Sequence, residues 1–426
     1  MKAIVNGRVK TRVNILAALV LGVAVVGVTS LAPAGSAVAQ EKKNTVSKEL
    51  AKTLKAAQEA VQAKKYNDAL AKLKDAESNP KKTPFDQHII NELSAFAYAH
   101  TNNAAEAAKA NEALVNDDFS KKSEIPARVK AVAVANYSLK NYDKTIEYGN
   151  RAIKGGFADD EIRTVVGQSY YLKGDYKSTV KFLQPIIDSE IKSGKAPKDS
   201  ELQLVLSACE KNDDTDCTTR LLERLVTYYP KPDYWKGLLY TLRNDRAFSS
   251  DAKKLQLFRL MSEVDVLQHG EDYTEMAQIA LDQGSPGEAQ QILEKGFQKG
   301  VFADQRSKDK NTRLLETAKK AAAADQAQLS KAEQEANAAP TGDKAVGVGL
   351  AYLGYGRYDK AIELISKGLT KGGLKSHSGV DAHLLLGIAQ LRAGHKDDAV
   401  KSFRQAKGDP SLERLASLWS LHAKQA

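Results

Sequence analysis

Apolar residues recur with a helical period along most of the chain. Between residues 66 and 76, for example, Tyr66, Ala69, Leu73 and Ala76 are separated by three or four residues, which places them on one face of an α-helix. Further segments of this kind follow one another towards the C-terminus, each bounded by turn residues. The pattern predicts an all-α protein.

A turn motif repeats at a fixed distance. Residues 141–145, Asn-Tyr-Asp-Lys-Thr, recur as residues 175–179, Asp-Tyr-Lys-Ser-Thr, so that Tyr142 and Tyr176 are 34 residues apart. In the second copy Gly167 precedes an aromatic residue, Tyr170, by three positions, and Gly174 opens the turn. This order and spacing resemble those of the tetratricopeptide-repeat (TPR) family.

Other segments carry parts of the same pattern. The clearest copies include Gly349 and Gly387, and weaker copies surround Tyr66, Ala95, Ala133 and Ala277. We count seven repeats and a degenerate one over residues 206–225. These Gly and Ala residues are expected where the two helices of a pair cross. A residue without a large side chain at the crossing lets the two backbones approach closely.

The resemblance implies an α-α superhelix, a TPR solenoid of stacked antiparallel helix pairs behind an N-terminal signal peptide. Stacked pairs share one core and present a concave surface lined mainly by the first helix of each pair. A partner-binding groove is therefore expected there. The residues that the repeat alignment places on its inner face are Gln58, Phe96, His100, Lys130, Tyr137, Thr164, Gln168, Tyr171, Gln278 and Arg392.

Irregular spacing between the repeats suggests how the chain is organised. Residues 307–339 are rich in Ala, Lys, Gln and Glu, which predicts one long, exposed, weakly packed helix. We predict a signal peptide over 1–39, an N-terminal TPR-like array over 40–302, a long polar Ala-rich helix or linker over 303–342, and a C-terminal TPR pair over 343–426. The last pattern, residues 412–421 with Trp419, resembles a capping helix.

The N-terminus has the three zones of a secretory signal peptide. Four basic residues precede an almost wholly apolar run over 15–28, and Ala37-Val38-Ala39 then supplies small residues. We expect cleavage after Ala39 and a periplasmic location, with secretion as the second choice. An uncleaved anchor is the alternative, but the run is short for a membrane span of about 20 residues. We expect no membrane span after cleavage.

Composition and charge exclude several classes of protein fold and binding partner. Proline (11 residues) and aromatic residues (7%) are too sparse for a β-sandwich or a proline-rich linker protein. The net charge of +10 falls to +6 without the four basic residues of the predicted signal peptide, and the remaining excess is spread along the chain. Nucleic acid is therefore not an expected partner.

The two cysteines, Cys209 and Cys217, flank a polar turn between two helical patterns. An exported pair is more readily oxidised than a cytosolic one, so a structural disulfide is the favoured interpretation. Free buried thiols and a redox-active pair are the alternatives. A redox role is disfavoured because the loop carries three Asp residues rather than an electropositive setting.

Candidate chemistry is scarce. The seven His residues occur singly, and no ligand set for a metal, no phosphate loop and no nucleophile elbow is found. We expect no cofactor, no metal and no catalytic residue.

The combined interpretation is a non-enzymatic periplasmic adaptor or scaffold that binds a protein or peptide of the cell envelope in its groove. Envelope assemblies of the kind implied by the resemblance and the export signal include TonB-type energy transduction, outer-membrane biogenesis and polysaccharide export. One alternative is a peptidoglycan-associated enzyme or enzyme-activating subunit. Another is a self-assembling structural repeat protein, so self-association stays open.

Overall fold

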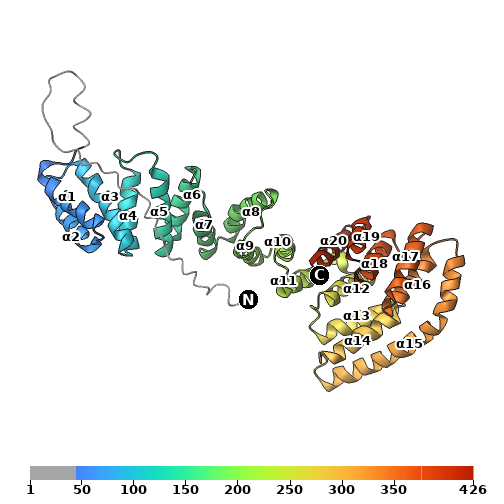
Figure 1. Cartoon of the computed structure of the whole chain (residues 1–426). Coiled ribbons are helices and arrows are strands. Elements are labelled where there is room, and N and C mark those ends of the chain that lie inside the picture. Colours follow the sequence, from blue (N-terminus) through green and yellow to red (C-terminus); the bar gives the residue numbers. More distant parts are fainter. Residues whose placement is uncertain (1–44, 376, 426) are drawn as a thin grey trace. The chain divides into compact units, whose positions relative to one another are not determined.

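The structure, a computed structural model, describes residues 45–375 and 377–425. The predicted signal peptide over residues 1–39 lies outside the described residues. Within them the chain forms 20 α-helices and a short 3₁₀ helix, and no strand is found in these ranges (Figure 1). The predicted all-α class is confirmed.

The chain folds as two compact units. Unit 1 holds the described residues up to Lys195 together with Ser207–Asn212, and unit 2 holds Ala196–Leu206 and the residues from Asp213 onward. Helix α9 (Asp199–Lys211) contains the boundary. The structure thus divides the chain at a different place from the predicted boundaries near residues 302 and 342. Residues from 303 onward pack into the same unit as residues 213–302.

Unit 1 is a row of antiparallel helix pairs. Its helices are α1 (Lys48–Gln62), α2 (Tyr66–Glu77), α3 (Pro84–His100), α4 (Ala104–Val115), α5 (Ile125–Ser138), α6 (Tyr142–Lys154), α7 (Asp160–Leu172) and α8 (Tyr176–Lys192). Each first helix contacts its own partner, and the first helices α1 and α3, and α5 and α7, contact each other.

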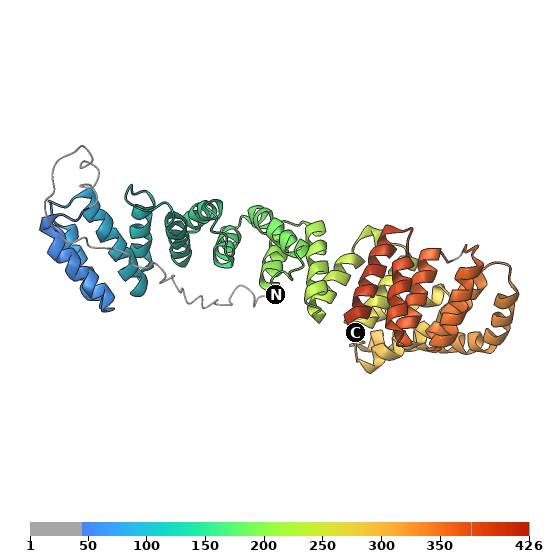
Figure 2. The same cartoon turned by 45° about the horizontal axis from the view of Figure 1, so that its top comes forward.

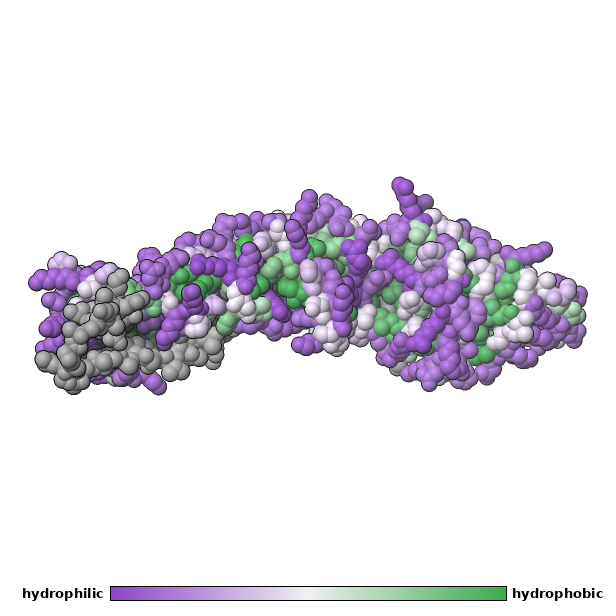
Figure 3. Space-filling view, turned by 90° about the horizontal axis from the view of Figure 1, so that it is seen from above, coloured by the Kyte–Doolittle hydropathy of each residue, from purple (hydrophilic) through white to green (hydrophobic). Residues whose placement is uncertain are grey.

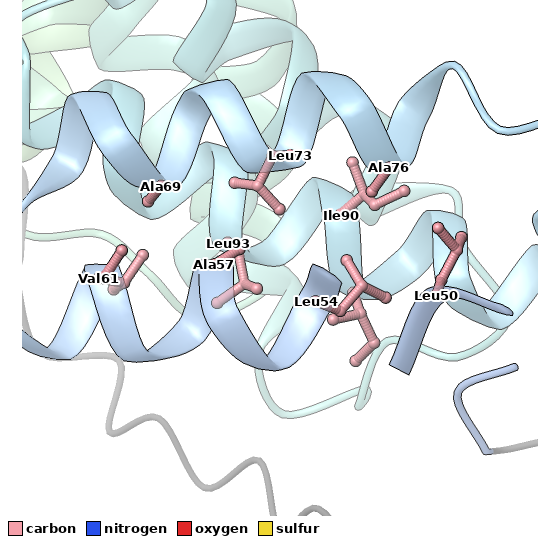
Figure 4. Packing of buried hydrophobic residues seen from close by; sticks show 11 residues of the cluster. Leu50, Leu54, Ala57, Val61, Ala69, Leu73, Ala76, Ile90 and Leu93 are labelled. Atoms are coloured by element: carbon pink, nitrogen blue, oxygen red, sulfur yellow. The ribbon is translucent and has the colours of Figure 1, made fainter. Parts of the chain in front are cut away.

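The core of the first repeats lies between α1, α2 and α3. Leu50 and Leu54 of α1, Leu73 of α2, and Ile90 and Leu93 of α3 are all at least 97% buried and point towards one another (Figure 4). Because α1 and α2 alone would leave Leu54 and Leu73 covered on one side only, α3 is needed to complete this core. The repeats therefore depend on their neighbours for stability.

The repeated turn motif has a local physical cause. Gly174 has φ 79°, a left-handed conformation that glycine adopts without steric cost. Asp175 is then the N-cap of α8, because its carboxylate accepts a hydrogen bond from the backbone N–H of Ser178 at 3.0 Å. Tyr176 begins the helix. In the preceding repeat Lys140 occupies the same left-handed position, with φ 59°.

The crossing glycines also behave as the pattern predicts. A Cβ atom added at Gly167 would lie 2.9 Å from Leu183, at Gly349 2.6 Å from Ile365, and at Gly387 2.4 Å from Phe403. Each glycine lies on the first helix of a pair, and the residue it contacts lies on the second. A side chain at any of these three positions would therefore have to displace the facing side chain or separate the paired helices.

Unit 2 contains the remaining pairs and one long helix. Its elements after α9 are α10 (Thr215–Tyr228), α11 (Pro232–Arg243), η2 (Arg246–Phe248), α12 (Asp251–Glu263), α13 (Gly270–Asp282), α14 (Pro286–Gln298), α15 (Gln305–Ala338), α16 (Asp343–Gly354), α17 (Tyr358–Lys371), α18 (Gly379–Arg392), α19 (Lys396–Gln405) and α20 (Pro410–Gln425).

Helix α15 is the predicted long helix, and most of its surface is exposed. Its buried side chains are few and mostly small: Asn311, Ala318, Ala322, Leu329 and Ala336. Several are seven residues apart, which keeps them on one stripe facing α14 and α16. The small side chains let α15 lie close to its neighbours, so a polar composition is compatible with a packed helix.

The C-terminal helix α20 returns to the beginning of unit 2. It contacts α12 as well as α18 and α19, and both views show the last helices beside those of the α12 region (Figures 1 and 2). Lys253 of α12 forms an ion pair of 2.7 Å with Asp409, directly before α20. Trp419 of α20 is fully buried against Phe403, with ring centroids 5.8 Å apart. Unit 2 is therefore closed by contacts between its two ends.

Acid is expected to weaken this closure. Burial raises the pKa of Asp409, but hydrogen bonds from Lys253, Ser411 and the Leu412 backbone outweigh it and lower the pKa to about 2. The unfolded carboxyl has a pKa of about 3.9, so the stability that Asp409 contributes is present above about pH 4 and lost as the pH falls towards 2. In urea unfolding at several pH values, Asp409→Asn should lose less stability over this interval than the wild type. If the free energies of unfolding of the variant and the wild type fell in parallel with pH, Asp409 would not be the group responsible.

Both cysteines, Cys209 and Cys217, are buried and disulfide-bonded. Since the chain contains no other cysteine, they pair with each other within one chain.

Candidate functional site

Three of the predicted groove residues link neighbouring repeats in unit 1. The Tyr137 hydroxyl of α5 donates a hydrogen bond to Gln168 Oε1 of α7 at 2.5 Å. The Tyr171 hydroxyl of α7 lies 2.8 Å from Ser207 Oγ of α9. Burial raises the pKa of Tyr137, which keeps its hydroxyl protonated. These tyrosines thus stabilise the stacking of first helices, and each hydrogen bond contributes about 0.5–1.5 kcal/mol.

The same tyrosines lie beside the turns between paired helices. The rings of Tyr137 and Tyr142 are 6.2 Å apart, and those of Tyr171 and Tyr176 are 5.2 Å apart. One exposed leucine accompanies each pair: Leu139 and Leu172 are both 45% exposed. We call this surface the turn strip, defined by Tyr137, Leu139, Tyr142, Tyr171, Leu172 and Tyr176.

Leu139 and Leu172 are functional candidates that sequence reasoning missed. They are the exposed large hydrophobic residues of the described chain: Leu139 is the C-cap of α5, and Leu172 is the last residue of α7, one position earlier in its repeat. The repeat pattern gave no signal for them, because the two leucines are 33 residues apart whereas the repeated turn motif recurs after 34. The face shown in Figure 3 is mainly hydrophilic and is interrupted by hydrophobic patches.

Two further predicted residues form an aromatic cluster near the N-terminal end of unit 1. The rings of Phe96 and His100 are 4.5 Å apart, and both contact Tyr66 of α2, with His100 stacked on it at 4.6 Å. Gln58 is half-buried on α1. Phe96 and His100 therefore meet each other, as expected of one surface.

Lys130 and Thr164 are engaged within the fold. The Lys130 side chain is only 6% exposed and forms ion pairs of 2.6 Å with both Asp159 and Glu161. Burial lowers its pKa, but the two carboxylates outweigh this and raise it overall. Lys130 thus joins α5 to the start of α7 instead of facing a ligand. The Thr164 hydroxyl donates to the Asp160 carbonyl of its own helix.

Gln278 and Arg392 belong to unit 2. Gln278 is exposed and donates to Asp282 on the same helix at 3.0 Å. Arg392 Nε lies 3.0 Å from Glu263 Oε2, which links α18 to α12. Arg392 therefore closes unit 2 and is not available in an open groove.

Metal-binding groups are not gathered in the part of the chain that the structure describes. No group of three His, Cys, Asp or Glu side chains there could hold a metal ion. Among the same residues, no helix combines the length and the apolar character that crossing a bilayer requires.

Comparisons with known proteins give only distant structural similarities. No family model and no curated protein matches the chain. A structure of Naa15/Naa10 bound to HypK-THB is 16% identical, with a TM-score of 0.29 over 87% of this chain. The pentatricopeptide repeat protein PPR10 from maize is 12% identical, with a TM-score of 0.29 over 87% of this chain. The P58(IPK) TPR domain is 13% identical, with a TM-score of 0.22 over 88% of this chain and 99% of that domain.

The chain spans 60% of the first of these structures and 61% of the second. The repeat type therefore rests on the chain's own helix pairs, on the 34 residues between the starts of α6 and α8, and on its crossing glycines. Repeats of this kind act as scaffolds that present extended binding surfaces. By these features the chain is an all-α helical repeat protein whose repeats resemble those of the tetratricopeptide type.

Proposed function

We propose that the chain is a non-enzymatic scaffold that binds an apolar segment of a protein partner on the turn strip of unit 1. The observation that carries this proposal is the pair of exposed leucines, Leu139 and Leu172, which lie at the ends of the first helices of consecutive repeats. Each lies beside half-buried tyrosines that are already fixed by contacts within the fold.

The strip has the composition of a binding surface. Fully burying an exposed Leu side chain stabilises a complex by about 1.5–3 kcal/mol, and tyrosines are enriched where proteins meet. Because Tyr137 and Tyr171 are held by Gln168 and Ser207, little side-chain freedom is lost on binding. A partner would therefore meet a preformed surface.

The cellular setting is part of the same proposal. The basic, apolar and small-residue zones over residues 1–39 support export, and a periplasmic scaffold would meet another protein of the cell envelope. Energy transduction of the TonB type, outer-membrane biogenesis and polysaccharide export are the settings we propose. Fractionation of cells that express the full chain or residues 40–426 tests the location, since only the full chain should reach the periplasm.

Site-specific crosslinking tests the turn strip. A photoreactive amino acid at position 139 or 172 of the full chain should give a discrete adduct in cells, because a partner would cover both leucines. The same amino acid at Glu147 or Lys181, exposed and equivalent positions on α6 and α8, should give none. An adduct with the mass of two copies would indicate self-association instead.

A matched pair of variants tests the contribution of the leucines. Leu139→Ser with Leu172→Ser should reduce adduct formation at least tenfold, whereas Glu147→Ser with Lys181→Ser should not change it. Both variants should unfold within about 0.5 kcal/mol of the wild type, because all four side chains are exposed. Equal capture by the two variants would remove the turn strip from the proposed site.

A further inference from the structure

A groove lies in unit 2, on the closing helix α20. It has a volume of about 790 Å³ and is bounded by α20, by the end of α19 and by α10. This size is within the range of pockets that take a ligand of several hundred daltons. None of the predicted groove residues lines it.

The walls of this groove are fixed to one another. Arg414 of α20 forms an ion pair of 2.5 Å with Glu223 of α10. Near the other end of α20, Gln425 donates a hydrogen bond of 2.9 Å to the Val226 carbonyl of α10. Two contacts about three helical turns apart keep α20 in place beside α10. The groove is therefore preformed.

The floor of the groove is apolar. Phe403 and Leu418 are buried, and Leu421 is half-exposed at the surface of α20. Ser417 lies on the same side of α20 and is exposed. A ligand side chain in the groove would therefore contact carbon atoms below it and solvent above.

The rim of the groove carries uncompensated positive charge. Four cations line it, together with two carboxylates. Both carboxylates are engaged, since Glu223 pairs with Arg414 and Glu413 pairs with Lys407 at 3.1 Å. Arg404 and Lys424, the other two cations, are exposed and have no ion pair among the described residues. Two positive charges are left to face a ligand.

We propose that this groove binds an extended acidic segment of a partner protein. Carboxylates of the segment would pair with Arg404 and Lys424, and an apolar side chain between them would lie on Leu418 and Leu421. From Glu413 to Lys424 the groove runs along about 16 Å of helix, which matches about five residues of extended chain. The site is separate from the turn strip and does not depend on it.

Fluorescence anisotropy with a defined probe tests this site on the chain from residue 40. The probe is a fluorescein-labelled hexapeptide in which two leucines are flanked on each side by two acidic residues. It should bind saturably, and the matched peptide with Asn and Gln in place of the acids should bind at least tenfold more weakly. Equal affinity for both peptides, or no binding of the acidic one, would overturn the proposal.

Three variants locate the binding. Arg404→Gln with Lys424→Gln should weaken binding at least tenfold, whereas Lys375→Gln with Lys396→Gln, which removes the same charge from exposed positions elsewhere in unit 2, should leave it unchanged. Ser417→Trp should block the groove sterically without altering the core. Unchanged helicity verifies that each variant folds, and unchanged tryptophan emission verifies it for the two charge variants.

The variants that lose peptide binding show whether the peptide lies in the groove. Equal weakening by both charge variants, or full binding by Ser417→Trp, would mean that the peptide binds by net charge outside the groove and would overturn the proposal. Leu139→Ser with Leu172→Ser should not affect the probe, so failure of this site and failure of the turn strip are distinguishable.

Discussion

Replacing Arg259 with methionine is expected to lower the free energy of unfolding of unit 2 by about 3–5 kcal/mol. Arg259 of α12 is 3% exposed and holds both carboxylate oxygens of Glu288 on α14, at 2.8 and 2.7 Å. Burial raises the pKa of Glu288, but Arg259 outweighs this and, with Arg392, lowers it. Without Arg259 a buried carboxylate would lose its hydrogen-bonded partner, and Arg392 is already paired with Glu263.

Urea unfolding followed by tryptophan fluorescence measures this loss directly, because the only two tryptophans, Trp235 and Trp419, both lie in unit 2. Adding Glu288→Leu to Arg259→Met should recover most of the stability, since an apolar pair can replace a buried ion pair. Lys401→Ala, which breaks an exposed ion pair with Asp398, should cost less than about 1 kcal/mol.

The size of the Arg259 effect should also depend on pH. In the wild type the lowered pKa of Glu288 adds stability that is present above about pH 4.3 and lost as the pH falls below it. In Arg259→Met that pKa is no longer lowered by Arg259, so protonation removes the buried charge. The deficit of the variant should therefore shrink in acid. A deficit that stays constant down to pH 3 would argue against an electrostatic cause.

A second large effect is expected from Gly342→Ala, which should destabilise unit 2 by about 3 kcal/mol. A Cβ atom at Gly342 would lie 1.8 Å from the carbonyl oxygen of Gly368, so the start of α16 and the end of α17 would have to separate. The obstacle is backbone and cannot move aside by a rotamer change. Urea unfolding by tryptophan fluorescence measures the loss.

Gly379→Ala is the matched control for this prediction. Gly379 begins α18, and a Cβ atom there would have no neighbour within 4 Å. Alanine also favours the helix over glycine, so this variant should be neutral or slightly more stable. If both variants unfolded at the same urea concentration, the close approach of Gly342 and Gly368 would not be an energetic constraint.

Local features of the fold could be predicted from the sequence because their causes are local. The turn before α8 needs a left-handed residue and a helix cap, and Gly174 and Asp175 supply both within two positions. The crossing positions of Gly167, Gly349 and Gly387 follow from the same repeat pattern. Such features are encoded within about one repeat, so a pattern of residue types is sufficient.

Features that join distant segments could not be predicted in this way. Arg392 has the spacing of a groove residue, yet it pairs with Glu263, 129 positions away. Periodicity gives the face on which a side chain lies but not the element that covers that face. For the same reason Lys130 was predicted to face a partner, whereas Asp159 and Glu161 of the next repeat already neutralise it. The closure of unit 2 was not predicted either.

The candidate site was predicted only in part, for a related reason. The repeat alignment led to Tyr137 and Gln168, which are hydrogen-bonded to each other, and to Tyr171, which contacts Ser207 of the next repeat. It did not lead to Leu139 and Leu172, because an exposed leucine differs from a buried one only by its surroundings.

The return of α20 to the start of unit 2 has a consequence for the order of folding. In unit 1 the contacts join neighbouring repeats, so structure can form progressively as the chain emerges during synthesis. In unit 2, Arg414 must reach Glu223 across 191 positions and Gln425 must reach Val226 across 199. These contacts have a high loop-closure cost and form only when the last helix is available. A nascent chain would thus carry a folded unit 1 and a unit 2 whose two ends are not yet joined, until its synthesis is almost finished.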